Sequence, residues 1–170
     1  MRFSRVLLFA TALGVFGASA LSAGYTRYTD PKQLFSAEVP AAWKPLTTSI
    51  SAGGLSISIP GAAIQLQAEA FPGRRLSVAD QFDAFEQGFN AQAAGRSTAK
   101  LMGSKAASYG GVPGQERLYD APLAEQVLKM RLWIGVKDRV VYNLFYTAQA
   151  KVYAVQQPAF QHVLDSFKAR

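Results

Sequence analysis

Residues 128–146 read LKMRLWIGVKDRVVYNLFY, and the alternation within them sets the architecture of the chain. Apolar residues occupy every second position from Leu128 to Val136 and again from Val140 to Tyr146, which is the periodicity of β-strands. Lys137-Asp138 separates the two runs and predicts a tight turn. We therefore expect a long antiparallel hairpin at the centre of a sheet.

Further strands are expected before this hairpin. The clearest form a second hairpin, in which Leu55–Ile59 and Ile64–Ala68 alternate on either side of a Pro60-Gly61 turn. Phe35–Val39 alternates in the same way and stops at Pro40. Weaker strands are expected at Tyr25–Tyr28, Leu46–Ile50, Leu101–Tyr109 and Gln115–Tyr119, with a tight connection over Gly110–Gly114.

Two helices are predicted from apolar residues at helical spacing. In the first, Ser77 is the expected N-cap, with Asp80 favourably placed in the first turn. Its apolar stripe consists of Val78, Phe82, Phe85 and Phe89, and Gly95 is the expected stop. The second helix is expected to begin near Pro158, and its apolar face consists of Phe160, Val163, Leu164 and Phe167.

Strands, a helix, more strands and a second helix follow one another, and this order predicts an α+β fold. We expect a central antiparallel sheet of about six strands flanked by helices, an α/β/α sandwich. A chain of 170 residues has the usual size of one domain, and 49% hydrophobic residues suffice for a core without disulfides. Residues 21–170 are therefore expected to form one domain.

Residues 1–20 are interpreted as a cleaved export signal. Arg2 and Arg5 supply its positive region, an apolar run follows, and Ala18-Ser19-Ala20 matches the small-x-small pattern of signal-peptidase sites. The alternative is an uncleaved membrane anchor, because the apolar run extended to Ala23 reaches the lower limit for a bilayer span. With the signal removed, no integral membrane segment is expected. The absence of cysteine suits a bacterial envelope, so we expect a periplasmic or secreted protein.

The net charge of +7, from 18 basic and 11 acidic residues, favours anionic partners such as an acidic protein or an anionic envelope component. Lys and Arg are spread along the sequence, which argues against a nucleic-acid-binding surface. Arg74-Arg75 is the one adjacent basic pair, and it is either a contact site or a solvated loop. The sequence does not identify the partner, and we expect a monomer or a weak dimer.

No constellation of catalytic or metal-binding residues stands out, so we expect no enzyme and no bound cofactor or metal. The single histidine, His162, lies three residues before Asp165 on the expected C-terminal helix, where both side chains share a face. His162 could be a general base oriented by that carboxylate, or a polar or half-buried helix residue that makes one hydrogen bond. No nucleophile motif accompanies them. Folding could also bring Glu69 and Glu116 together as paired carboxylates, although no motif indicates it.

The best candidate binding surface consists of Lys129, Arg131 and Trp133. The three alternate with the aliphatic residues of the long hairpin and therefore share the opposite face of the sheet. Two basic side chains and an indole could bind an acidic or aromatic partner. Alternatively, a helix covers this face, and the basic side chains lie along the Trp133 ring.

Three segments in a fixed order carry a resemblance to a known family. They are Phe35–Trp43, with its strand, proline and tryptophan; Gly110–Tyr119, followed by the long hairpin; and Phe160–Phe167, which ends in Ser-Phe. Together they resemble the PsbP-like family and the bacterial envelope domains that share its fold. The resemblance implies an antiparallel sheet between helical layers and a non-enzymatic accessory or partner-binding role. The metal-binding histidines of some photosynthetic members have no counterpart here, so neither a photosystem role nor a functional residue carries over.

The sequence thus predicts an exported, non-enzymatic accessory or partner-binding module of the bacterial cell envelope. Two alternatives from other classes stay open. One is a small hydrolase or lyase that uses His162. The other is an adhesin that binds anionic wall or lipid surfaces through its net positive charge.

Overall fold

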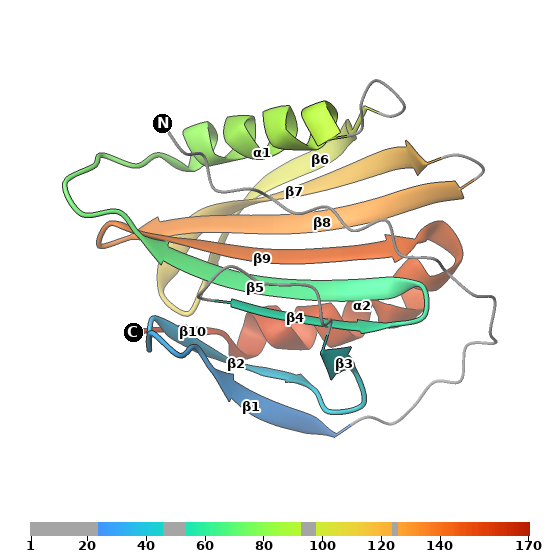
Figure 1. Ribbon diagram of the computed structural model, residues 1–170, viewed down its shortest axis with the longest axis horizontal. Coiled ribbons are helices and arrows are strands. Elements are labelled where there is room, and N and C mark those ends of the chain that lie inside the picture. Colours follow the sequence, from blue (N-terminus) through green and yellow to red (C-terminus); the bar gives the residue numbers. More distant parts are fainter. Residues whose placement is uncertain (1–23, 46–53, 93–97, 124–125) are drawn as a thin grey trace.

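The computed structural model describes residues 24–45, 54–92, 98–123 and 126–170 (Figure 1). The interpreted export signal, the expected strand Leu46–Ile50 and the expected helix stop at Gly95 lie outside these residues. The elements follow in the order β1 (Tyr25–Thr29), β2 (Phe35–Pro40), β3 (Lys44–Pro45), β4 (Gly54–Ile59), β5 (Ala62–Ala70), α1 (Val78–Gln92), β6 (Lys100–Tyr109), β7 (Val112–Leu123), β8 (Gln126–Lys137), β9 (Val140–Gln149), α2 (Ala150–Ser166) and β10 (Lys168–Ala169).

The predicted central hairpin is confirmed as β8 and β9, which lie in the middle of an antiparallel sheet of order β3-β4-β5-β9-β8-β7-β6. Its turn falls one residue later than expected, because Lys137 pairs with Val140 and leaves Asp138 and Arg139 to turn the chain. Both residues have positive φ, 50° and 65°, as the tightest hairpin turns require. The Arg139 carbonyl accepts a hydrogen bond from the amide of Phe71 (2.9 Å), which holds this turn against the end of β5.

The second predicted hairpin is confirmed as β4 and β5, with Gly61 at φ 87° in its turn. Strand β5 pairs with β9 over nine residues, from Ala62 opposite Ala148 to Ala70 opposite Val140. This pairing joins the first half of the chain to the second. Among the described residues this sheet has seven strands where about six were expected, and β1, β2 and β10 form a separate three-stranded sheet.

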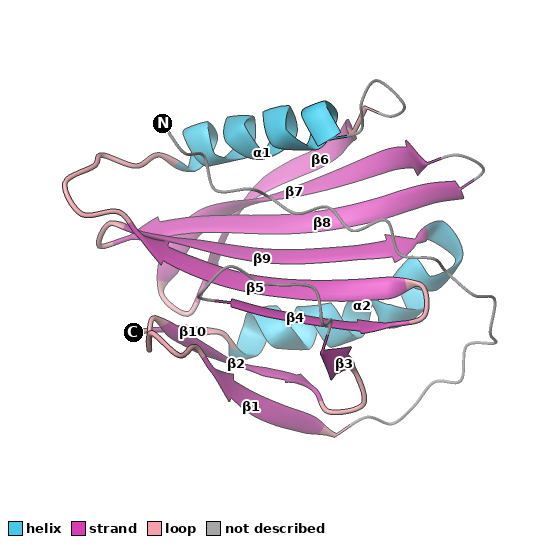
Figure 2. Ribbon diagram, in the orientation of Figure 1, coloured by secondary structure: helices cyan, strands magenta, loops and turns pink. Residues whose placement is uncertain are grey.

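Both faces of the central sheet are covered, one by each helix (Figure 2). Successive residues of a strand point to opposite faces. On β8, Met130 and Leu132 pack in a cluster with the phenylalanines of α1, whereas Trp133 packs in a second cluster with Phe160 and Leu164 of α2. The α+β sandwich expected from the sequence is therefore present, with the sheet between two helical layers.

Helix α1 begins as the sequence predicts. The Ser77 hydroxyl accepts a hydrogen bond from the amide of Asp80 (3.0 Å), which is the geometry of an N-cap. Phe82, Phe85 and Phe89 are buried, so the predicted aromatic stripe is a core face. In the described ranges, no helix is long and apolar enough to cross a membrane.

Helix α2 begins eight residues earlier than expected, and Pro158 lies inside it. The prediction from Pro158 was wrong because a proline in the first turn is only a local preference. The turns before it are held by the sheet: the Tyr146 hydroxyl donates to the Tyr153 carbonyl (3.0 Å), and the two rings are 5.1 Å apart. Packing on both sides of the proline therefore stabilises a continuous helix.

The small sheet of β1, β2 and β10 packs against α2. Its strand β2 contributes three buried residues, Phe35, Ala37 and Val39, to the cluster that contains Phe160 and Leu164 of α2. The chain then ends as β10, in which Lys168 lies opposite Ser36. Strands β1 and β10 thereby lie on either side of β2, at one edge of the molecule (Figure 1).

Candidate functional site

The strand β6 is an exposed edge of the seven-stranded sheet. It has ten residues, and in the described part of the chain only β7 pairs with it. Both helices pack over more central strands, so most of β6 is exposed, including Leu101 (47%) and Met102 (54%). Long exposed edges with apolar side chains pair readily with other chains, and proteins normally block them.

The register shows which backbone groups of β6 are open. The two-residue turn at Gly110 and Gly111, both with positive φ, makes Tyr109 opposite Val112 a hydrogen-bonded pair. Hydrogen-bonded pairs alternate along an antiparallel ladder. The N–H and C=O groups of Ser104 and Ala106 therefore point away from β7, at positions where a further strand would pair.

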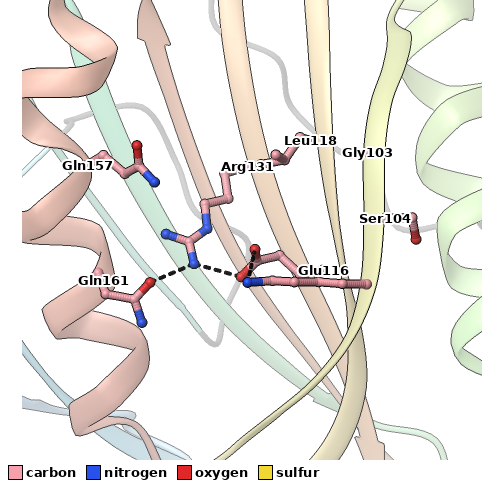
Figure 3. Close-up of a pocket in the computed structure, with 8 residues that line it drawn as sticks. Gly103, Ser104, Glu116, Leu118, Arg131, Gln157 and Gln161 are labelled. Atoms are coloured by element: carbon pink, nitrogen blue, oxygen red, sulfur yellow. Dashed lines mark hydrogen bonds and ion pairs between the residues drawn. The ribbon is translucent and has the colours of Figure 1, made fainter.

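A pocket of about 300 Å³, open to solvent, lies beside this edge on the face covered by α2 (Figure 3). Strands β6, β7 and β8 form one side of it and α2 the other. Its lining residues are Gly103, Ser104, Lys105, Glu116, Leu118, Arg131, Gln157 and Gln161.

A buried ion pair lies at the inner end of the pocket. Arg131 Nη2 donates to Glu116 Oε2 (2.7 Å), and the two side chains are only 4% and 3% exposed. The same Nη2 donates to Gln161 Oε1 (2.6 Å), and Glu116 also accepts from the Tyr109 hydroxyl (3.1 Å) and pairs with Lys105 Nζ (3.3 Å). The guanidinium is thus held between a strand and α2.

Both members of this pair are charged. Burial raises the pKa of Glu116, but the hydrogen bond and charge of Arg131, with a contribution from Lys105, lower that pKa by more. Burial lowers the pKa of Arg131, and the Glu116 carboxylate raises it by more. The pocket therefore contains two positive side chains and one negative side chain.

One end of the guanidinium is left without a partner. Arg131 Nη1 is buried and forms no hydrogen bond in the described residues. Buried polar groups are nearly always paired, and a charged donor left unpaired is costly. This donor lies just behind the pocket surface and lacks an acceptor in the described residues.

The floor of the pocket is kept open by Gly103. A Cβ placed there would meet only Leu118 Cδ1, at 3.8 Å, which is ordinary contact. Neither packing nor a positive φ requires glycine at this position. Glycine inside a strand often marks a bulge or a place where another group approaches closely, and the register of β6 with β7 shifts between Leu101 and Gly103.

The predicted surface of Lys129, Arg131 and Trp133 is not one surface in the structure. Trp133 is fully buried, and its indole N–H donates to the Ala107 carbonyl (3.2 Å). Lys129 pairs with Asp120 (3.0 Å) outside the pocket. The alternative interpretation, in which a helix covers this face, agrees with the position of α2.

The other predicted contact, Arg74-Arg75, lies exposed in the loop between β5 and α1 and does not line the pocket. Of the five predicted binding residues, only Arg131 does. Sequence reasoning missed Lys105, Gln157 and Gln161 as pocket residues. Strand register alone brings Lys105 opposite Glu116, and no local motif reveals it.

His162 is a half-buried residue of α2 with one hydrogen bond in the described residues, as the non-catalytic interpretation expects, but its partner is not Asp165. Its Nε2 is 2.9 Å from Glu38 Oε2, and its ring stacks on Tyr25 with centroids 3.7 Å apart. Asp165 instead accepts a hydrogen bond from Gln161 (2.8 Å). The possible pair with Asp165 does not form, because β2, which is distant in sequence, places the Glu38 carboxylate beside the helix. Glu116, raised above as one member of a possible carboxylate pair, is paired with Arg131 and Lys105. The described residues include no cluster of three or more His, Cys, Asp or Glu side chains suited to a metal.

The contact between Glu38 and His162 predicts a pH dependence. The hydrogen bond from His162 lowers the pKa of Glu38, burial opposes this, and the charges of His162 and Arg27 lower it further. Ionised Glu38 therefore contributes stability that is complete above its ordinary pKa of 4.5 and is lost as the pH falls through the lowered value. The urea-unfolding midpoints of the wild type and Glu38→Gln should differ near neutral pH and converge in acid. A difference that stays constant at every pH would contradict this role.

Comparison with solved structures identifies proteins with a similar fold. The chain resembles the solution structure of cyanobacterial PsbP (CyanoP) from Synechocystis sp. PCC 6803, with a TM-score of 0.70 and 15% identity over 93% of this chain and 99% of that one. LpqN of Mycobacterium tuberculosis, described as involved in cell envelope biogenesis, matches with a TM-score of 0.54 and 14% identity, over 86% of this chain and 84% of that one. A Pseudomonas aeruginosa protein of unknown function, PA94, described as a putative regulator, matches with a TM-score of 0.52 and 18% identity, over 86% and 97%.

Comparisons of sequence alone add no relative. No protein-family profile matches the chain, and no curated protein sequence matches it. The similarity to solved structures confirms the expected PsbP-like fold. At these sequence identities the similarity concerns the fold alone.

Proposed function

We propose that this chain, which has the PsbP-like fold, is an exported, non-enzymatic accessory module that binds a partner protein along β6 and the pocket beside it. The proposal is supported by the open edge of β6. Its outward N–H and C=O groups, together with exposed Leu101 and Met102, provide what an added strand needs.

Export to the bacterial envelope is the second part of the proposal. It rests on the signal-like residues 1–20 and the absence of cysteine. LpqN, which shares the fold, is described as involved in cell envelope biogenesis. Sequencing the N-terminus of the protein recovered outside the cytoplasm tests this part.

The enzymatic alternative has less support from the site. In the described part of the chain, the hydrogen-bond partner of His162 is Glu38, and no hydroxyl nucleophile is bonded to the imidazole. The pocket beside β6 contains no histidine. Its charged side chains are paired with one another, through Glu116 with Arg131 and Lys105.

Site-specific photo-crosslinking in intact cells tests the binding surface. A photo-reactive residue in place of Met102 should give one discrete adduct with a partner protein. The control position is Val155, which is also apolar and similarly exposed (49% against 54%) but lies on α2. We expect no adduct of the same mass from Val155.

A proline variant shows whether the adduct depends on the edge of β6. In Ala106→Pro the ladder to β7 is intact, because the Ala106 N–H points outward, but a strand can no longer pair there. The adduct from position 102 should fall to background. Equal adducts from Met102 and Val155, or an adduct that Ala106→Pro leaves unchanged, would refute docking at β6.

A further inference from the structure

We propose that the pocket beside β6 is a carboxylate-binding site, in which Arg131 and Lys105 hold one carboxylate group of the ligand. The inference rests on the proposed function, since it names the chemistry that the pocket would recognise in a bound partner. The same carboxylate could belong to an acidic residue of a docked segment or to a free organic acid, and the experiment below separates these sources.

The charges of the pocket favour a single anionic group. Arg131 and Lys105 contribute two positive charges, and Glu116 contributes one negative charge. Lys129 and Asp120, on the same sheet face, pair with each other and add no net charge. One carboxylate would therefore neutralise the pocket, whereas a cationic ligand would increase its excess of positive charge.

The hydrogen-bonding capacity of Arg131 favours the same ligand. Its Nη2 is already bonded to Glu116 and Gln161, while its Nη1 has no partner in the described residues. Hydrogen bonds between a guanidinium and a carboxylate are among the strongest in proteins. A carboxylate oxygen would satisfy a donor that the protein itself leaves unpaired.

The route to this donor passes Gln157. Nη1 is shielded from solvent, and Figure 3 shows the Gln157 side chain beside the guanidinium. Gln157 is half-buried, and in the described residues its amide forms no hydrogen bond, so its rotation loses none. A ligand can therefore displace this amide and bind Arg131. The exposed Lys105 ammonium would then contact the same carboxylate at the solvent-facing opening of the pocket.

Titration with a carboxylate and its neutral amide tests the proposal. The probes are glutarate and glutaramide, followed by a short extended peptide with a central glutamate and its glutamine counterpart. Backbone amide shifts of Gly103, Lys105 and Arg131 provide the readout. We expect each acid to bind about tenfold or more tightly than its amide, as the loss of charge-assisted bonds implies.

Five variants test whether binding depends on the pocket. Gly103→Leu should abolish acid binding by filling the pocket, and Lys105→Met should weaken it about tenfold. Lys129→Met is the matched control, since this lysine shares the sheet face but lies outside the pocket, and it should bind like the wild type. If Arg131→Met alone fails to fold, the double variant Arg131→Met/Glu116→Leu removes the pair together and should bind neither acid.

These experiments distinguish a failure of the carboxylate site from a failure of docking at β6. Stronger binding of the peptide than of glutarate identifies the source as a docked segment, and equal binding identifies a free acid. Acids that bind no better than their amides, or sulfate that binds as well as glutarate, would overturn the carboxylate site. The proposed function would still stand if the β6-dependent crosslink persisted.

Discussion

Replacing Glu116 with leucine should destabilise the protein by about 3–5 kcal/mol, because it leaves the charge of Arg131 buried without its counter-ion. Arg131 Nη2 donates to Glu116 at 2.7 Å, and both side chains are almost fully enclosed. The remaining acceptor, Gln161, is neutral and satisfies only one of the guanidinium donors. Urea unfolding followed by tryptophan fluorescence measures the loss.

The double variant Glu116→Leu/Arg131→Met separates two explanations of that loss. Replacing both members of a buried ion pair by apolar residues is often neutral or stabilising. We therefore expect the double variant to recover most of the stability while losing the pocket's chemistry. A double variant as unstable as Glu116→Leu would show that the pair is needed for the fold and would weaken its assignment to binding.

Replacing Trp133 with alanine should cost about 3–5 kcal/mol, the usual range for a fully buried large aromatic residue. Its indole packs edge-on against Tyr109 and Phe167, with centroids 5.4 Å and 5.6 Å away, and its N–H is bonded to Ala107. The substitution removes the side chain that joins the central strands to the end of α2. Chemical denaturation measures the loss, and Trp133→Phe, which keeps a ring, should lose less.

Two glycines provide an independent check on Trp133. A Cβ at Gly135 would collide with the indole ring, so Gly135→Ala should cost about 1–3 kcal/mol by overpacking. Gly103→Ala is the matched control in the same sheet and should be near neutral, since that position is open. In a Trp133→Ala background the cost of Gly135→Ala should fall but not vanish, because Val112 Cγ1 would still lie 2.8 Å from the added Cβ, and purely additive effects would contradict the contact with the indole.

Much of the fold could be predicted from the sequence because alternation and helical spacing are local. The run from Leu128 to Tyr146 identifies the central hairpin, and the stripe of Phe82, Phe85 and Phe89 identifies α1. The start of α2 could not be predicted. The residues before Pro158 are helical because they pack on the sheet, and that packing depends on distant strands.

The candidate site was less predictable than the fold, for a physical reason. Arg131 was selected because it is basic and lies on the same face as Trp133, but the sequence does not show whether a helix covers that face. The partner of Arg131 is Glu116, on a different strand, and only the pairing of β7 with β8 brings them together. The partner of His162 was missed for the same reason, since Glu38 is 124 residues away in sequence.

The surface formed by β6 and the adjacent pocket can be tested directly by amide hydrogen exchange with and without the glutamate-containing peptide. We expect the peptide to slow exchange at the outward amides of Ser104 and Ala106 and to shift the resonances of Lys105 and Arg131. Changes confined to the Arg74-Arg75 loop or to the surroundings of His162, with β6 unaffected, would contradict it.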